Sequence, residues 1–357
     1  MKICIVAGGT GGHIAPALAV AEKIEREEKF FITGKSRASE KRFIKNIDAK
    51  EIQYIDVKPI VGKGLKSALG FFSSFLSLKE SYEILKKINP DVVIGFGGYV
   101  SGPVCLAGKI LKKKVFIHEQ NSVMGFTNKV ASLFSDKVFT SFKETEAPML
   151  LKKKFVYSSF PLRNKFKEDL QRGLEKKNDS DKLTIFVSGG SQGAVGLNKL
   201  FVETIEKIAK VFPNIRNHLK IFHQTGDLSF DFVHNSLSSW NAEVFPFTDD
   251  FGFFLGMCDI AISRGGAGTV FEIAFSKKVA IFVPLPKSAG GHQEKNPRYL
   301  LSDSCFIVRQ YEKHKFEINL SDLIMNEGLR RDFAEKLKDI HVEDGSFRIL
   351  NFVRERG

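Results

Sequence analysis

Cysteine is scarce in this chain. The four cysteines among its 357 residues lie far apart, mostly in apolar runs, and this spacing excludes a disulfide framework or a cysteine-based zinc site. Long apolar runs are missing too, since no window approaches the roughly 20 apolar residues that span a bilayer. No signal peptide is visible after Met1. We therefore expect a soluble cytosolic protein with reduced core cysteines, which leaves attachment to a membrane surface open.

Two common nucleotide-binding signatures are also absent. The opening "GGTGGH" (residues 8–13) lacks the G-x-G-x-x-G order, and no acidic residue ends the second predicted strand. No G-K-[ST] follows a glycine loop either, so a hydride-transfer enzyme or an ATPase is disfavoured. The Asp-x-Asp pattern of a metal site occurs once, at Asp179–Asp181. It lies in a polar linker before a strand, and we interpret it as a solvated charge run. No metal or other cofactor is expected.

Acidic residues are outnumbered by basic ones, 41 to 54, which gives a net charge of +13. Such an excess indicates an anionic partner, an anionic membrane surface or a general bias toward lysine. The basic residues are dispersed, with only short clusters such as Lys112–Lys114 and Lys152–Lys154. Because no nucleic-acid-binding motif accompanies them, nucleic acid is not expected as a partner.

What the sequence does contain is a repeated unit of buried strand, glycine turn and helix. The unit opens the chain at Ile3–Val6 and returns in "KLTIFVSGGSQGAVGLNKLFVETIEKI" (residues 182–208). Further strand candidates alternate with helical stretches: Phe30–Thr33, Val92–Gly95, Val115–Ile117, Lys137–Thr140, Leu219–His223, Ala242–Phe245, Ile260–Ser263, Val279–Pro284 and Cys305–Val308. This alternation predicts parallel sheets covered by helices. We predict an α/β fold of two doubly wound, Rossmann-like domains facing across a cleft. They comprise residues 1–162 and 163–339, and a helix at about 340–357 packs back on the first.

Glycine-rich turns follow the predicted strands in both halves. They are Gly8–Gly12, Gly95–Pro103, Ser188–Ala194, Ser263–Thr269 and Ser288–Asn296. A helix N-terminus behind such a turn presents unpaired amides and a partial positive charge, which attract phosphate. Ligands of these sheets bind outside the carboxyl ends of the strands. The turns therefore predict a large anionic ligand in the cleft.

The motifs "GGTGGHIAPALAVA", "GFGGYVSGP", "HEQNSVMGFTNK", "VSGGSQGA", "RGGAGTVFEIA" and "GGHQEKN" resemble a bacterial family. It is that of the UDP-N-acetylglucosamine–N-acetylmuramyl-(pentapeptide) pyrophosphoryl-undecaprenol N-acetylglucosamine transferases, of glycosyltransferase family 28. The resemblance implies a GT-B fold and inverting, metal-independent transfer of N-acetylglucosamine from UDP-GlcNAc to undecaprenyl-linked lipid I, which gives lipid II for peptidoglycan, cell shape and division.

The resemblance also assigns ligands to the two predicted domains and a place in the cell. Residues 1–162 would bind the acceptor and residues 163–339 the donor. The protein would lie on the cytoplasmic face of the cell membrane as a peripheral protein. Anionic lipids and other cell-wall synthesis proteins are further candidate partners.

Three residues are candidates for the chemistry. His13, where the glycine turn becomes a helix, could be the base that takes the acceptor's proton, or it could hydrogen-bond backbone or phosphate. Glu119 is the rival base, or a member of a turn network. Arg163 could stabilise the departing diphosphate, or form an interdomain salt bridge. Phe160 stands where the family usually has asparagine.

Binding residues follow from the same resemblance. Glu272 would bind ribose, Gln293 and Asn296 the transferred sugar, and backbone near Thr248 the uracil. The full donor set is Thr10, Gly11, Gly12, Asn121, Arg163, Ser191, Gln192, Gly193, Thr248, Glu272, Gln293 and Asn296. The acceptor's pyrophosphate would lie at Gly97, Gly98, Tyr99 and Ser101.

A membrane contact is predicted at "GLKSALGFFSSFLSLKE" (residues 64–80). A helix there would press aromatic side chains into the headgroup boundary while lysines meet anionic lipid. The candidates are Lys66, Leu69, Phe71, Phe72 and Phe75. The alternative is an ordinary helix that covers the sheet.

Two other functions fit parts of the pattern. A sugar-nucleotide 2-epimerase of the same architecture would also bind UDP-GlcNAc, but it needs neither a lipid acceptor nor the "GGYVSGP" turn. A nucleotide-sensing membrane adaptor would bind without turnover, and it would need none of His13, Glu119 and Arg163.

Overall fold

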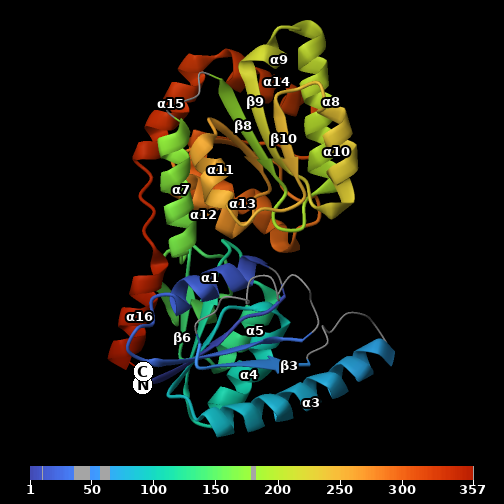
Figure 1. The fold of residues 1–357 in the computed structure, drawn as a ribbon. Coiled ribbons are helices and arrows are strands. Elements are labelled where there is room, and N and C mark those ends of the chain that lie inside the picture. The colour runs from blue at the N-terminus through green and yellow to red at the C-terminus, as the bar shows by residue number, and fades with distance from the viewer. Residues whose placement is uncertain (10, 36–48, 57–64, 178–181, 357) are drawn as a thin grey trace. The chain divides into compact units, whose positions relative to one another are not determined.

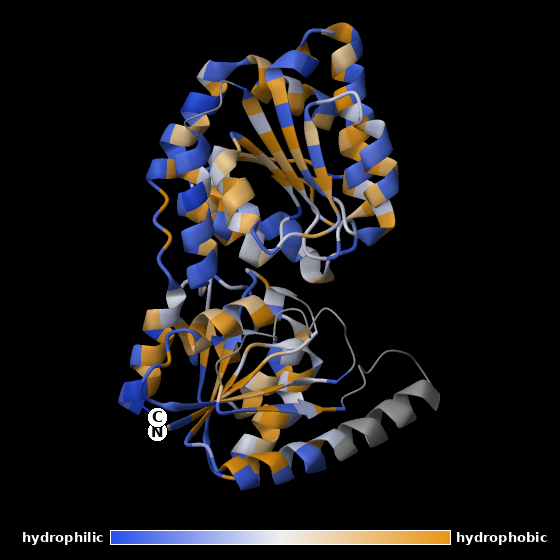
Figure 2. Cartoon of the chain, viewed as in Figure 1, coloured by the Kyte–Doolittle hydropathy of each residue, from blue (hydrophilic) through white to orange (hydrophobic). Residues whose placement is uncertain are grey.

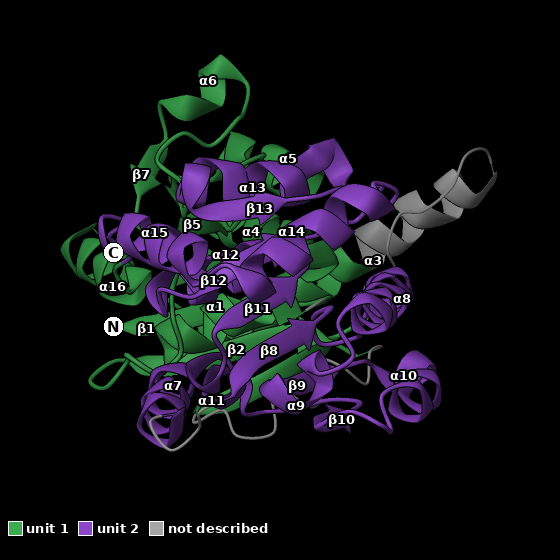
Figure 3. Ribbon diagram, turned by 90° about the horizontal axis from the view of Figure 1, so that it is seen from above, with its two compact units in different colours: residues 1–163, 343–357 green, residues 164–342 purple. Residues whose placement is uncertain are grey.

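The computed structural model describes residues 1–9, 11–35, 49–56, 65–177 and 182–356, without the side chains of 65–76 (Figure 1). The chain divides into two compact units. Unit 1 comprises residues 1–163 and 343–357, and unit 2 comprises residues 164–342 (Figure 3).

Unit 1 is built on a parallel sheet that, within the described residues, has seven strands in the order β3-β2-β1-β4-β5-β6-β7. Its strands are β1 (Lys2–Val6), β2 (Glu28–Gly34), β3 (Glu51–Ile55), β4 (Val92–Gly95), β5 (Lys114–Glu119), β6 (Lys137–Thr140) and β7 (Phe155–Tyr157). The central strands are apolar because helices cover both faces of the sheet (Figure 2). The strand order reverses between β1 and β4, which is where ligands of such sheets bind.

Helices cover both faces of the unit 1 sheet. They are α1 (Gly11–Ala21), α3 (Leu65–Ile88), α4 (Gly98–Ile110), α5 (Phe126–Phe134), α6 (Met149–Lys152) and α16 (Gly345–Arg356). Helices α3, α4 and α5 contribute to one core cluster, and α1 and α16 contribute to the other. Phe352 of α16 packs edge-on against Phe116 and Phe139, and Arg354 pairs with Glu27. The C-terminal helix thus belongs to unit 1.

Unit 2 repeats the design with a parallel sheet that has six strands in its described part, in the order β10-β9-β8-β11-β12-β13. Its strands are β8 (Leu183–Ser188), β9 (Leu219–Gln224), β10 (Ala242–Phe245), β11 (Ile260–Ser263), β12 (Val279–Phe282) and β13 (Cys305–Ile307). Its α-helices are α7 (Asn164–Lys177), α8 (Val195–Val211), α9 (Ile215–His218), α10 (Phe230–Ser236), α11 (Phe251–Met257), α12 (Ala267–Phe275), α13 (His292–Leu301), α14 (Lys313–Met325) and α15 (Glu327–Lys338). Short 3-10 turns are η1 (Asp227–Ser229), η2 (Ala289–Gly291) and η3 (Ser302–Ser304). Here the order reverses between β8 and β11.

The two doubly wound sheets confirm the predicted fold class. The prediction missed two edge strands, β3 and β7, because Glu51–Ile55 mixes polar and apolar residues and Phe155–Tyr157 is only three residues long. The unit boundary falls after Arg163, one residue later than predicted. The predicted cleft between the domains stays a prediction.

The four cysteines are buried and free, as expected for reduced core residues. No helix among the described residues combines the length and apolar character needed to cross a membrane.

Candidate functional site

His13 lies where the strand order of unit 1 reverses. It sits in the first turn of α1, and its Nδ1 is 3.0 Å from the carbonyl oxygen of Phe96, just after β4. A carbonyl only accepts hydrogen bonds, so Nδ1 carries the hydrogen. In the neutral ring the lone pair is then on Nε2, as a general base needs. The Nε2 of Gln120 also donates to the Phe96 carbonyl, at 2.6 Å, which further immobilises this anchor.

The glycine turn before α4 closes against the turn after β1. Gly97 and Gly98 have φ angles of 88° and 77°, which favour glycine. A Cβ on Gly98 would lie 2.0 Å from the carbonyl oxygen of Gly8, and one on Gly97 would lie 2.8 Å from His13 Nδ1. The two glycines therefore allow the turns and the histidine to come together.

Two of the predicted acceptor residues differ in what they offer a ligand. Ser101 is fully buried, and its hydroxyl is 2.6 Å from the carbonyl oxygen of Gly97 and 3.3 Å from that of Val6. Its side chain stabilises the turn, and its contact with an acceptor stays a prediction. Tyr99 is half-buried beside Gly9 and remains a candidate for acceptor contact.

Glu119 is the centre of a turn network, which was the alternative to its role as a base. It is 1% exposed. One carboxylate oxygen accepts from the backbone and side-chain nitrogens of Asn121, at 2.9 and 3.2 Å. The other accepts from the backbone of Gly125 at 3.0 Å and from Asn128 Nδ2 at 2.8 Å. Four donors satisfy both oxygens of this buried carboxylate, which favours a structural role.

His118 precedes this network and is also buried. Its Nε2 is 3.1 Å from the hydroxyl of Ser141. Burial, with a smaller effect from the charge of His13, lowers the pKa of His118 to about 3. The ring of His118 is therefore neutral at physiological pH.

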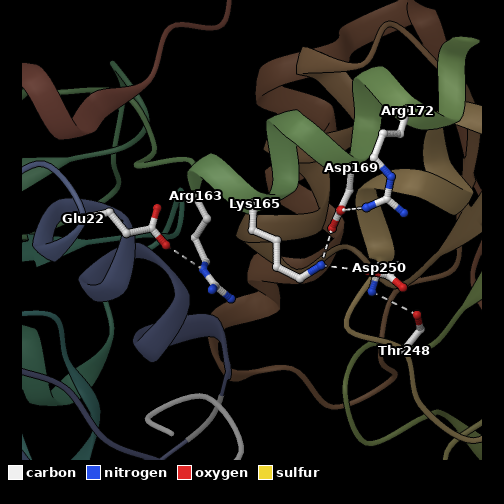
Figure 4. A network of polar contacts seen from close by, with 7 residues as sticks. All are labelled: Glu22, Arg163, Lys165, Asp169, Arg172, Thr248 and Asp250. Carbon is white, nitrogen blue, oxygen red and sulfur yellow. Dashed lines mark hydrogen bonds and ion pairs between the residues drawn. The ribbon is translucent and has the colours of Figure 1, made fainter. Parts of the chain in front are cut away.

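Arg163 forms an ion pair with Glu22 at the end of unit 1, with Nε 3.2 Å from Oε1 (Figure 4). Both residues belong to unit 1, so the salt bridge is not interdomain, as the alternative had it. The side chains are 31% and 27% exposed, and the arginine is therefore accessible to an anion. The adjacent Phe160 is buried, with its ring beside His118.

The turn between β8 and α8 has the form of a phosphate site. Gly190 and Gly193 have φ angles of 89° and 72°. A Cβ on Gly190 would meet no described atom within 4 Å, whereas one on Gly193 would lie 2.0 Å from the Thr225 carbonyl oxygen. Ser191, Gln192 and Gly193 thus form a tight turn with an open side. No described side chain caps the α8 N-terminus, which suits an anion.

The other predicted donor residues of unit 2 lie on α12, α13 and the turn before α11. Asn296 is fully buried and donates to the Gly265 carbonyl at 2.9 Å. Gln293 Oε1 accepts from the backbone of Leu285 at 2.9 Å. Glu272 is half-buried on α12. Thr248 accepts from the backbone of Asp250 at 3.0 Å (Figure 4).

Several residues around these turns were not predicted: Gln120, Asn128, Asn198, Gln224, Arg264 and Gln310. Asn198 and Gln224 donate to the Thr225 and Gly190 carbonyls, at 2.8 and 2.9 Å, and hold the phosphate turn. Their signal was a polar side chain in an otherwise apolar strand end or helix face. Arg264 lies directly before a glycine pair, in the motif "RGGAGTVFEIA".

Some predicted residues lie outside the described ones. Thr10 and Asp179–Asp181 are among them, as are the side chains of Lys66, Leu69, Phe71, Phe72 and Phe75. Gly11 and Gly12 are described, at the start of α1. Among the described residues, no group of three or more His, Cys, Asp and Glu side chains is arranged to hold a metal ion.

Two family models match the chain. They are the glycosyltransferase family 28 N-terminal domain over residues 3–140 and the family 28 C-terminal domain over residues 184–341. Among solved structures, MurG from Acinetobacter baumannii has a TM-score of 0.76 at 25% identity and covers 99% of both chains. A UDP-GlcNAc 2-epimerase from Neisseria meningitidis has a TM-score of 0.69 at 15% identity over the full length of both, and it shows the fold alone.

Curated relatives carry one name. The UDP-N-acetylglucosamine–N-acetylmuramyl-(pentapeptide) pyrophosphoryl-undecaprenol N-acetylglucosamine transferase of Geotalea daltonii is 36% identical over 324 residues, which are 87% of this chain and 85% of the relative. That of Francisella philomiragia is 34% identical over 99% of this chain and 97% of its own. This chain therefore belongs to glycosyltransferase family 28 and, within it, to the family of these N-acetylglucosamine transferases.

Proposed function

We propose that this protein transfers N-acetylglucosamine from UDP-GlcNAc to the muramyl 4-hydroxyl of undecaprenyl-pyrophosphoryl-MurNAc-pentapeptide, lipid I, and so makes lipid II. The observation that carries this proposal is the 31–36% identity, over most of the chain, to relatives that all bear the transferase name. Four 2-epimerases among the structural neighbours are 11–15% identical and support only the shared fold.

The acceptor would be activated by His13 in unit 1. Its Nε2 takes the proton of the 4-hydroxyl as that oxygen bonds to C1 of the donor sugar. The C1–oxygen bond to the β-phosphate breaks, its electron pair leaves with UDP, and the α-linked sugar becomes β-linked. The hydrogen bond from Nδ1 to the Phe96 carbonyl supports this role because it sets the tautomer with the base on Nε2.

The leaving diphosphate would be stabilised without a metal ion. The glycine turn before α8, a helix of 17 residues, offers backbone amides and a positive helix end to the phosphates. Arg163 would contribute a guanidinium once a phosphate competes with Glu22. We accordingly expect transfer to be unaffected by chelation of divalent ions.

The experiment is transfer of radiolabelled N-acetylglucosamine from UDP-GlcNAc to a short-chain lipid I analogue, with and without EDTA. The expected result is a labelled disaccharide lipid formed in step with UDP. Release of UDP without labelled lipid, or formation of the 2-epimer of the sugar, would overturn the proposal. Loss of transfer in EDTA would overturn only its metal-independent part.

The lipid acceptor requires contact with a membrane, and we propose that an exposed apolar face on α5 and α6 contributes to it. Five large apolar side chains of these two contacting helices are between 43% and 82% exposed: Phe126, Val130, Leu133, Met149 and Leu150. The exposed Lys152 and Lys153 border them. Apolar side chains with lysines beside them suit a surface of anionic lipid, and such contact makes the protein a peripheral one.

Sedimentation with vesicles of anionic phospholipid tests this surface. The double variant Phe126→Ser, Leu133→Ser should bind at least threefold more weakly, with little change in Tm because both side chains are exposed. Leu228→Ser is the matched control, since Leu228 is 90% exposed in unit 2. Equal binding by the wild type and the double variant would exclude this face.

A further inference from the structure

Arg264 leaves the unit 2 sheet beside the phosphate turn. It follows Ser263, the last residue of β11, which is in register with Ser188, the last residue of β8. The Ser263 hydroxyl donates to the Ser188 carbonyl at 2.8 Å. Neighbouring strands lie about 4.8 Å apart, so Arg264 and Gly189, the first residue of the turn, emerge side by side where the strand order reverses.

The guanidinium of Arg264 is buried among neutral groups. The residue is 8% exposed. Nη1 donates to the carbonyls of Val283 and Pro284, at 2.9 and 3.2 Å, and Nη2 donates to Oε1 of Gln310 at 2.7 Å. Nε has no partner, and no carboxylate pairs with this arginine, in the part of the chain that the structure describes. Burial lowers the pKa of Arg264 to about 10, so the group is still charged at neutral pH.

A buried cation without a counter-ion is costly, and proteins usually supply a carboxylate. Here the partner is the neutral amide of Gln310. That amide packs on the first turn of α8, because a Cβ added to Gly196 would lie 2.3 Å from Gln310 Nε2. The charge of Arg264 is thereby held next to the positive end of α8, where a second positive group is unfavourable unless an anion binds.

We propose that Arg264 is a fixed positive charge that strengthens binding of the donor's diphosphate, and that Gln310 is the positioning residue that holds it without neutralising it. The proposal rests on the proposed function, since it takes a uridine diphosphate sugar as the ligand of unit 2. Glutamine is the suitable residue because it accepts the hydrogen bond and adds no negative charge. A glutamate would form an ion pair and cancel the field at the turn.

The test compares binding of UDP and uridine, by calorimetry at low salt, to the full-length wild type and the Gln310→Glu variant. A carboxylate still accepts from Arg264, so folding should be retained. UDP should bind about five- to tenfold more weakly to the variant, whereas uridine, which lacks phosphate, should bind within twofold of wild type. The Asn235→Asp variant, at an exposed position on α10, controls for the added negative charge. It should change the affinity for neither ligand.

Gln310→Met separates charge from packing. This substitution removes the hydrogen bond but leaves the charge of Arg264. It should therefore weaken UDP binding less than Gln310→Glu does. Equal losses in the two variants, or unchanged UDP binding in Gln310→Glu, would overturn the inference. If the wild type binds UDP and transfers label, and Gln310→Glu binds UDP equally well, only this inference is contradicted. A wild type that transfers no label contradicts the proposed function itself.

Discussion

His13 and Phe96, 83 positions apart, meet where two turns of unit 1 converge, with His13 Nδ1 3.0 Å from the Phe96 carbonyl oxygen. This contact gives the ring one orientation and one neutral tautomer. The proposed role of His13 as a base depends on this contact, because it leaves the lone pair of the neutral ring on Nε2.

Replacing His13 by alanine should lower kcat/KM by about 10²- to 10⁴-fold, the usual contribution of a general base. The affinity for UDP should be unchanged, since the residue acts on the acceptor's proton. Initial rates of label transfer between pH 5 and 9 measure the effect, and the acidic limb of the wild-type profile should disappear. A loss below tenfold would assign the base elsewhere.

Glu119→Gln should act mainly on stability. The substitution keeps the shape but removes the charge that accepts four hydrogen bonds, at an expected cost of about 2 kcal/mol. Thermal unfolding should show a lower Tm, and the surviving enzyme should keep the acidic limb of its pH profile. An unchanged Tm together with a hundredfold loss of kcat would make Glu119 the base after all.

Arg163→Ala should reduce kcat at least tenfold with little effect on Tm, because partly exposed ion pairs contribute at most about 1 kcal/mol. Glu22→Gln is its matched partner, since it breaks the same 3.2 Å pair but leaves the guanidinium. Activity should survive in Glu22→Gln. If both variants lost activity equally, the pair would be structural and Arg163 would have no separate role toward the diphosphate.

Gly98→Ala should be strongly destabilising. Its φ is 77°, and the new Cβ would lie 2.0 Å from the Gly8 carbonyl oxygen, so the turn must open at a cost above about 2 kcal/mol. Gly102→Ala, in the same helix, places its Cβ 3.8 Å from the nearest described atom, on Thr127, and should be neutral or stabilising. Chemical denaturation of the two variants checks the contrast, which equal stabilities would refute.

Acid should destabilise the protein through buried histidines. Burial lowers the pKa of His223 from 6.5 to about 3, so between these values the unfolded chain binds a proton that the folded chain does not. The free energy of unfolding then falls with decreasing pH, by up to about 1.4 kcal/mol per pH unit for each such group. His223→Gln should flatten this slope between pH 6.5 and 4, while the exposed His234→Gln should keep it. Equal pH dependence of the free energy of unfolding in the wild type and both variants would show that His223 does not cause this loss of stability.

Much of the fold could be read from local patterns. Buried parallel strands appear as short apolar runs such as Val92–Gly95 and Ile260–Ser263, whose predicted bounds match β4 and β11. The edge strand β3 carries a weaker signal, because Glu51–Ile55 is paired on one side only and is mostly half-buried. The glycine turns were also recognisable locally, because their backbone conformation requires glycine.

The sequence by itself determined the strand–turn–helix units, the return of this unit in the second half of the chain and the glycine turns. These features depend on burial and backbone geometry within a few residues. Tertiary structure alone decided which polar side chains are used internally, in hydrogen bonds to other parts of the chain. Glu119, Ser101 and Asn296 looked like ligand contacts, yet each is buried. Glu119 and Ser101 are bonded within their own turns, and Asn296 is bonded to the distant Gly265 carbonyl. The side chain of Gln310 accepts a hydrogen bond from Arg264, which lies 46 positions earlier in the chain. Such pairings follow from how strands and helices pack. They cannot be read from the sequence, because the same polar residue can bind a ligand or a distant backbone group.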